Sequence, residues 1–202
     1  MSDSLITKKA IAGSLKELMK KKSLEKITVS DIVKNCDLNR QTFYYHFKDK
    51  YDLIDWIFNK EIVSALLGVS DGVEWSAALL NALNVMKREK VFYFGAVNLA
   101  EQSVFSEDLF GVVRDMLLHI VDQIPPSSAD ENSGNIAPED RLFIAEFYAH
   151  GLVGMVIEWV KAGMKEPPEE IVGRLTRFVD DSKHASTARY LKDNTGYDSP
   201  AS

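Results

Sequence analysis

Hydrophobic residues recur at intervals of three and four positions along nearly the whole chain. This spacing places apolar side chains on one face of an α-helix. No run alternates convincingly with a period of two, so the pattern predicts an all-α protein. The predicted helices are a first one with Ile11, Leu15, Leu18 and Met19 on one face, short ones from Thr28 to about Cys36 and over 40–47, a fourth after Asp49, and others near 72–87, 89–99, 107–123, 138–163 and 168–180.

The fourth helix, which Asp49 is predicted to cap, has apolar residues at helical spacing. They are Leu53, Ile54, Ile57, Phe58, Ile62, Leu66 and Leu67. The segment 125–140 is rich in Pro, Ser, Asp and Asn, which predicts a polar loop. The last residues, 183–202, lack periodicity and are predicted to be a flexible tail.

Polar residues mark the starts of the short helices. Thr28 is followed three positions later by Asp31, which resembles a capping box with Asp in place of Glu. Asp37 tolerates the left-handed conformation of a tight turn, and Asn39 can cap the next helix. Two short helices joined by such a turn and packed on a preceding helix predict a helix-turn-helix domain.

The helix over 40–47 has two chemically different faces. Phe43 and Phe47 lie four positions apart on one face. The opposite face carries Gln41, Tyr44, Tyr45 and Lys48, flanked by Arg40 and Thr42. A buried helix would not place cations opposite the Phe pair, and an aromatic RNA-stacking platform is normally built on a sheet or barrel. The pattern favours a recognition helix whose outer side chains reach DNA bases and phosphates.

Charge is distributed unevenly along the chain. The net charge of −6 alone argues against a nucleic-acid binder. However, residues 1–60 carry 12 Lys and Arg against 8 Asp and Glu, whereas the remainder carries 12 against 22. A basic head on an acidic body is typical of a phosphate-binding module attached to a different domain. A random fluctuation of surface charge is the alternative.

The stretch "ITVSDIVKNCDLNRQTFYYHFKDKYDLI" resembles the DNA-binding head of TetR-family transcriptional regulators. The ordered run "TFYYHFKDK" carries the resemblance, which covers roughly residues 5–55. It implies a helix-turn-helix domain over 1–50 and a larger helical regulatory and dimerisation domain over 51–182. One position departs from the family pattern, because Asp37 stands where a Gly is usual.

The resemblance also assigns roles to individual residues. It implies that Arg40 and Gln41 read bases, that Thr42, Tyr44 and His46 contact phosphate and sugar, that Lys50 contacts phosphate and that Tyr45 does either. The full set expected at double-stranded DNA is Thr28, Asn39, Arg40, Gln41, Thr42, Tyr44, Tyr45, His46, Lys48 and Lys50. For His46, a partly buried residue bonded to backbone is the alternative.

A homodimer is expected, because one short helix in one major groove gives too little affinity and specificity. The resemblance places the interface on the last two helices, as a four-helix bundle of two copies. The candidate interface residues are Gly151, Leu152, Gly154, Met155, Trp159, Leu175 and Phe178. Packing of the same helices within one chain is the alternative.

A small-molecule effector is expected between the helices spanning 55–160. The candidate pocket residues are Trp75, Phe92, Phe94, Phe105, Phe110, Phe147, Tyr148 and His150, although at helical spacing such residues are more often ordinary core. The runs "FYYHFKDKYDLIDWIF" and "GLVGMVIEWVKAGMKEPPEEI" also resemble a subgroup typified by the activator of the dihydroxyacetone kinase operon. That resemblance implies a kinase-like protein partner as the alternative effector.

The sequence gives little support to other classes of protein. It has no phosphate-cradling glycine loop, no nucleophile elbow and no paired His on one helix face, so neither an enzyme nor a metal or cofactor site is predicted. The apolar stretch 142–160 contains Glu146, His150 and Glu158, which disfavours a membrane span. With the single Cys36 and no leader, a soluble cytoplasmic protein is expected. A helical adaptor without DNA binding would not need the basic head.

Overall fold

The computed structural model describes residues 3–66, 74–99, 105–122, 138–179 and 181, and every regular element in these ranges is helical. The chain divides into two compact units, Met1–Lys165 and Glu166–Ser202. Each unit is considered by itself. The predicted tail, most of the predicted 125–140 loop and Leu67 lie outside the described residues.

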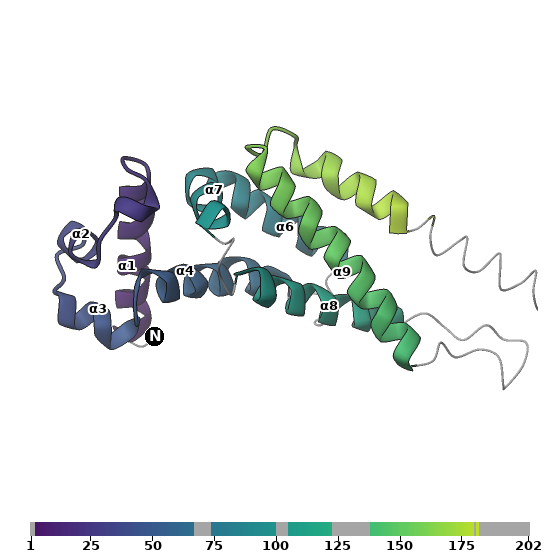
Figure 1. Ribbon diagram of the computed structural model, residues 1–202, viewed down its shortest axis with the longest axis horizontal. Helices are drawn as coiled ribbons and strands as arrows, with labels where there is room; N and C mark the ends of the chain where they lie inside the picture. The colour runs from purple at the N-terminus through teal and green to yellow at the C-terminus, as the bar shows by residue number, and fades with distance from the viewer. Residues whose placement is uncertain (1–2, 67–73, 100–104, 123–137, 180, 182–202) are drawn as a thin grey trace, which may run out of the picture. The chain divides into compact units, whose positions relative to one another are not determined.

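The chain begins with a small helical head. Helix α1 (Asp3–Met19) leads through a 3-10 turn, η1 (Leu24–Lys26), to α2 (Val29–Asn35) and α3 (Arg40–His46), as Figure 1 shows. Both short helices contact α1. Their shared core is apolar and almost completely buried, with Ile11, Leu15, Ile32, Phe43 and Phe47 at its centre. The predicted helix-turn-helix arrangement is confirmed.

Side chains fix the starts of these helices, as predicted. The Thr28 backbone N–H donates to Asp31 Oδ2 at 2.9 Å, and the Asp31 N–H donates to Thr28 Oγ1 at 3.2 Å, which completes the capping box. The Oδ1 atom of Asn39 accepts from the Thr42 N–H at 2.8 Å. Asp37 adopts φ 54°, so the turn uses the left-handed conformation.

The fourth helix is shorter than predicted. Helix α4 (Lys50–Phe58) starts on the side-chain cap of Asp49 and gives way to a π-helical turn, η2 (Asn59–Val63), before the brief α5 (Ser64–Leu66). The Ser64 hydroxyl donates to the Asn59 carbonyl at 3.1 Å, five residues earlier. That bond stabilises the wider turn. Apolar spacing alone cannot reveal such a turn, because Ile62 within it and Leu66 after it are both buried, as in an unbroken helix.

Four longer helices form the body of the first unit: α6 (Trp75–Arg88), α7 (Lys90–Leu99), α8 (Phe105–Asp122) and α9 (Pro138–Lys161). Helix α9 contacts α8 and α7, and α7 contacts α1 of the head. The interior of the body is apolar, with Leu83, Phe92, Tyr93 and Ala149 among its most deeply buried residues. The predicted all-α class is confirmed.

Helix α9 is unusually apolar for a helix of its length. Its segment Asp140–Lys161 is long and apolar enough to cross a membrane by length and composition. A core helix passes the same test. In this chain Ala145, Ala149 and Val153 of α9 are buried, and α9 contacts α8.

The described part of the second unit is mainly a helix over 168–179, which begins at Pro168. Arg174 forms an ion pair with Glu166, and the Thr176 hydroxyl donates to the Val172 carbonyl at 2.9 Å. The predicted helix near 168–180 is confirmed. The predicted domain boundary after residue 50 stays a prediction, since the head and the body belong to one compact unit.

Candidate nucleic-acid interface

Helix α3 buries one face and exposes the other, as the sequence predicts. Phe43 is fully buried, and Phe47, just past the last helical residue, is 2% exposed. On the other side Tyr44 is half exposed and Tyr45 is 82% exposed. The remaining candidates on or near α3 divide into Arg40, Gln41 and Lys48, which are exposed, and Thr42 and His46, which are partly exposed.

The buried side of α3 is anchored to both neighbouring helices. The rings of Phe43 and Phe47 lie 5.8 Å apart, and Phe47 meets the Trp56 ring of α4 at 5.8 Å. From α1, the ammonium of Lys8 lies 5.4 Å from the Phe47 ring centroid and 5.8 Å from that of Trp56. These distances fit cation–π contacts. Apolar contacts thus hold α3 in place, which leaves its polar side available.

The exposed side of α3 presents a cation, hydroxyls and an amide close together. Arg40 Nη2 lies 3.4 Å from the Tyr44 hydroxyl, and its guanidinium carbon lies 5.8 Å from the Tyr44 ring centroid. The Tyr45 ring meets His46 edge-on at 4.9 Å. Guanidinium and amide groups can bind base edges, whereas hydroxyls and ammonium groups can bind phosphate. The arrangement can therefore make both kinds of contact with DNA.

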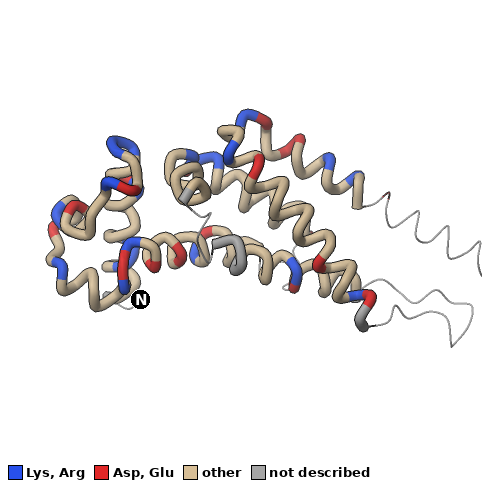
Figure 2. The backbone as a smooth tube through the Cα atoms, in the orientation of Figure 1, with Lys and Arg blue, Asp and Glu red and all other residues tan. Residues whose placement is uncertain are grey.

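Two candidate residues, Thr28 and Asn39, use their side-chain oxygens to cap helices α2 and α3. The Thr28 hydroxyl donates to Asp31 Oδ2 at 2.8 Å, and Asn39 Oδ1 accepts from both the backbone and the hydroxyl of Thr42. The Lys22 ammonium, 2.8 Å from Asp31, and the Thr28 hydrogen bonds hold the pKa of the Asp31 carboxyl well below its usual range. Lys and Arg also lie at both ends of α3 (Figure 2). Contacts of Thr28 and Asn39 with DNA stay predictions.

Lys50 has a set of partners that the sequence does not indicate. Its ammonium donates to the backbone carbonyls of Leu24 at 2.9 Å, Glu25 at 3.1 Å and Ile27 at 3.1 Å. It also lies 5.5 Å from the ring centroid of Tyr51. The phosphate contact implied for Lys50 stays a prediction, and these bonds give the side chain a second possible role.

Tyr51 is a candidate that the sequence reasoning missed. It lies in the first turn of α4, directly after Lys50, and its side chain is 48% exposed. An exposed aromatic with a hydroxyl resembles Tyr44 and Tyr45 in chemistry. The signal was present in "FKDKYDL", where Tyr51 follows the capping Asp49 by two positions.

Two family comparisons cover most of the chain. Residues 14–56 match the family described as "Bacterial regulatory proteins, tetR family". Residues 73–181 match the family described as "Transcriptional regulator C-terminal region", which spans more than half of the chain. The chain belongs to the TetR family of transcriptional regulators. This confirms the family that the sequence resembles.

Two curated relatives are similar to parts of the chain. The HTH-type dhaKLM operon transcriptional activator DhaS of Lactococcus lactis is 36% identical over 93 residues, which is 46% of this chain and 50% of that protein. The uncharacterized HTH-type transcriptional regulator YxbF of Bacillus subtilis is 24% identical over 175 residues, which is 83% of this chain and 42% of that protein. The matches thus span half or less of those relatives' length.

Solved structures share the fold. The dihydroxyacetone kinase operon activator DhaS superposes with a TM-score of 0.71 at 24% identity, over 88% of this chain and 96% of that one. A TetR transcriptional regulator from Streptococcus agalactiae gives a TM-score of 0.60 at 18% identity, over 87% and 94%. At these identities the likeness supports the fold and says nothing about operator or effector.

Beyond the interface, a polar cluster joins the head of this TetR-family chain to its body. Lys16 of α1 is mostly buried, and its ammonium lies 2.7 Å from Glu61 Oε1 in the π turn. The Tyr93 hydroxyl of α7 donates to Glu61 Oε2 at 2.9 Å, and burial raises the pKa of Tyr93, which keeps the hydroxyl protonated. Glu89 lies 3.7 Å from the same ammonium. Three segments far apart in sequence therefore meet at one ion pair.

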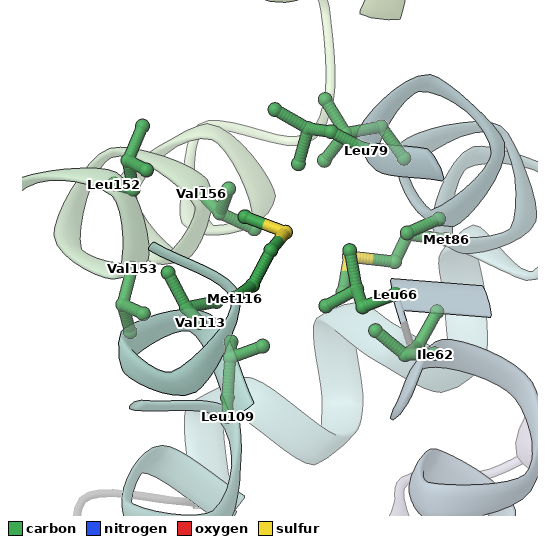
Figure 3. Close-up of a pocket in the computed structure, with 12 residues that line it drawn as sticks. Ile62, Leu66, Leu79, Met86, Leu109, Val113, Met116, Leu152, Val153 and Val156 are labelled. Carbon is green, nitrogen blue, oxygen red and sulfur yellow. The ribbon is translucent and has the colours of Figure 1, made fainter. Parts of the chain in front are cut away.

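The body contains a small apolar cavity of about 30 Å³, roughly the space for one or two waters. Side chains from η2, α5, α6, α8 and α9 point into it (Figure 3). The lining residues are Ile62, Leu66, Leu79, Ala82, Leu83, Met86, Leu109, Val113, Met116, Leu152, Val153 and Val156. The lining offers no hydrogen-bonding side chain.

None of the seven predicted pocket residues whose side chains the structure describes lines this cavity. Phe92 is buried, Phe94 and Phe147 are exposed, and His150 is exposed with its ring 4.2 Å from that of Phe110. Trp75 and Tyr148 are partly exposed, and the side chain of Phe105 lies outside the described set. Their roles as ligand contacts stay predictions. Among the described residues, no group of three or more His, Cys, Asp or Glu could hold a metal ion.

The predicted dimer residues fall into two groups. Gly151, Gly154 and Met155 are exposed on α9, in line with Phe143 and Phe147. A Cβ atom added at either glycine would meet nothing within 4 Å. Leu152 and Trp159, in contrast, are buried within the single chain, as is Leu175, while Phe178 is exposed. The interface itself stays a prediction.

Proposed function

We propose that this chain is a sequence-specific DNA-binding regulator that binds a palindromic operator as a homodimer. The two faces of α3 carry the proposal. Phe43 and Phe47 anchor the helix on its buried face, while Arg40, Gln41, Tyr44 and Tyr45 are exposed on the opposite face. A side chain that contacts the edge of a DNA base must be held by a rigid helix. A mobile helix would have to become ordered on binding, and the entropy lost would weaken the affinity for DNA.

The proposed roles follow from chemistry and position. Arg40 and Gln41 have forked groups that can bond bidentately to a base, so they read sequence. Thr42, Tyr44 and His46 contact phosphate and sugar, together with Lys48, and Tyr45 can do either. These contacts fix the register of the protein on the duplex and carry no sequence information directly.

A second copy is proposed to cover the exposed stripe of α9. Phe143 is 68% exposed, Phe147 is 66% exposed and Met155 is 49% exposed, so large apolar side chains on α9 face solvent in one chain. Gly151 and Gly154 in the same stripe have open space before them, which permits close approach of another helix. The helix over 168–179 contributes the rest, through Phe178. The pseudo-twofold operator would mirror this symmetry.

Control by a small-molecule effector is proposed to pass through the junction of head and body. The ion pair between Lys16 and Glu61 links α1 to the π turn that continues from α4, and Tyr93 brings α7 into the same cluster. An effector bound between α6 and α9 that favours one arrangement of this cluster would change the spacing of the two recognition helices. It would do so only through its different affinities for the two arrangements.

A protein partner is the second candidate effector. The similarity to DhaS, described as an operon activator, favours this alternative for the matched half of the chain. The cavity also favours it, because about 30 Å³ does not admit a drug-sized ligand without movement of the surrounding helices. A kinase-like partner acting on the body surface would then replace a bound small molecule. In either case the protein acts in the cytoplasm, where its DNA is.

Selection of duplexes from a random-sequence library tests the proposed function. The wild-type chain should enrich an inverted repeat whose half-sites are centred roughly 34–36 Å apart, or one helical turn. Binding should weaken steeply with added salt. If no sequence is enriched and duplex DNA shows no salt-dependent binding, the proposal is wrong. A helical adaptor without DNA binding would then be the remaining alternative.

A further inference from the structure

The segment just before α2 and the first residue of α4 meet at a single ammonium group. The carbonyls of Leu24, Glu25 and Ile27 converge on Lys50 Nζ at 2.9, 3.1 and 3.1 Å. These carbonyls lie 26, 25 and 23 positions before Lys50 in the sequence. The bond therefore closes a loop around the whole helix-turn-helix.

The match between donors and acceptors is complete. A lysine ammonium has three N–H donors and no acceptor. Each carbonyl accepts one hydrogen bond of ordinary length, which uses all three donors. A phosphate oxygen would have to displace at least one carbonyl to bind the same group. The side chain is only partly exposed, unlike Lys48 two positions earlier.

The neighbouring helix caps show which elements the three hydrogen bonds of Lys50 hold together. Ile27 directly precedes Thr28, the cap of α2, and Lys50 directly follows Asp49, the cap of α4. The Lys48 backbone N–H donates to Asp52 Oδ2 at 2.7 Å, which fixes the chain between α3 and α4. A shift of Lys50 would therefore move the end of α3 relative to the start of α2.

We propose that Lys50 is a positioning residue for DNA binding, whose ammonium clasps the ends of the helix-turn-helix and makes no phosphate contact. This inference rests on the proposed function and reverses the role that family resemblance implies for Lys50. It predicts that Lys50 sets the pose of α3, so that its loss weakens binding through Arg40 and Gln41. Lys48, with its exposed side chain, is left as the phosphate ligand of this segment.

The salt dependence of duplex binding separates the two roles. Lys48→Met and Lys50→Met each remove one positive charge, and the affinity of each for a random-sequence duplex is measured across a salt series. A lost phosphate contact lowers the slope of log affinity against log salt by about one. We expect that loss for Lys48→Met alone. Lys50→Met should keep the wild-type slope and bind a selected duplex about tenfold more weakly.

Thermal unfolding without DNA supplies the second readout. Lys50→Met should lower the midpoint by several degrees, on the order of 5 °C, whereas Lys48→Met should leave it unchanged. Lys50→Arg keeps the charge but replaces a compact ammonium with a planar fork that cannot converge on three carbonyls. It should therefore lose stability and selected-duplex affinity much as Lys50→Met does.

Three results would overturn the proposal: a slope for Lys50→Met that falls as far as that of Lys48→Met, an unchanged midpoint for Lys50→Met, or wild-type behaviour of Lys50→Arg. If Lys50→Met does not fold, the ammonium nitrogen resonance of Lys50 in the wild-type protein decides. It should be protected from exchange without DNA and keep its chemical shift when duplex is added. A shift on adding duplex would reject the clasp. Absence of any duplex binding by wild type would instead defeat the proposed function, with the thermal comparison still testing the clasp.

Discussion

The head and the body of the first unit are stabilised by different kinds of contact. In the head, individual polar side chains fix where each helix starts: Thr28 for α2, Asn39 for α3 and Asp49 for α4. In the body, apolar faces such as those of α8 and α9 hold the helices together, and many side chains of suitable size could do the same. The difference explains why the head carries a readable motif and the body does not.

The largest expected effect comes from the anchor of α3. Phe43→Ala removes a fully buried ring, and it should lower the free energy of unfolding by about 3–5 kcal/mol. Denaturant unfolding measures the loss. Tyr45→Ala on the opposite face of the same helix, where the side chain is 82% exposed, should change the value by less than about 0.5 kcal/mol. Equal effects from the two variants would mean that α3 has no buried face.

A second prediction concerns the stripe of α9. Gly154→Leu should fit the single chain, since nothing lies within 4 Å of an added Cβ, but should hold a partner helix away. We expect monomers by sedimentation and operator binding weaker by roughly a hundredfold, about 2.8 kcal/mol. Gly13→Leu on α1, which also has open space before it, is the matched control and should remain dimeric. A dimeric Gly154→Leu with wild-type affinity would place the interface elsewhere.

Much of the head could be predicted from sequence because its determinants are local. The caps at Thr28 and Asn39, the left-handed Asp37 and the Phe43–Phe47 face all depend on residues within a few positions of one another. They were predicted correctly. The helices of the body were also predicted, since their periodicity is local too.

The remainder depends on contacts between residues far apart in sequence. Lys16 lies 45 positions from Glu61, and Lys50 lies 23 or more from its carbonyl partners, so no short pattern pairs them. The residues that line the cavity come from five separate elements and are all aliphatic residues or methionines. Candidates chosen from the sequence for their aromatic character therefore did not include these residues. The π turn was missed because Ile62 and Leu66 are spaced four apart, which is also the spacing of an α-helix.

The exposed face of α3 gives the third prediction. Arg40→Ala and Gln41→Ala should each weaken binding to the selected duplex by about 1–3 kcal/mol and relax the preference at one base position. Competition with single-base variants of the duplex measures both quantities. Lys34→Ala on α2 removes an exposed charge and should leave the base preference unchanged. Unaltered preference in all three variants would remove Arg40 and Gln41 from the readout.

The smallest expected effect is a pH dependence of the α2 cap. Lys22 and Thr28 lower the pKa of Asp31 in the folded chain, so this carboxylate stabilises the fold at pH values above the ordinary Asp pKa of about 3.9. That contribution should be lost progressively as the pH falls below about 4, because the unfolded chain, whose Asp31 keeps its ordinary pKa, takes up a proton more readily than the folded chain does. Asp31→Asn should therefore unfold at a lower temperature than wild type at neutral pH.

The difference in unfolding temperature between Asp31→Asn and wild type should shrink on acidification. Thermal unfolding measured at neutral pH and again below about pH 4 would record this change. Asp115→Asn, at an exposed site on α8, serves as the control and should show little change at either pH. A difference for Asp31→Asn that grows toward low pH would have the wrong sign for this cap.

The most direct test of the central claim is the ratio of wild-type affinities for the selected duplex and for a scrambled duplex of the same composition at one fixed salt concentration. The account predicts a ratio of about 10³ or more, because the exposed side chains of α3 read base edges in both half-sites. A ratio near one, with binding that still weakens in salt, would show that the head binds only the DNA backbone. That result would contradict the claim that α3 reads sequence.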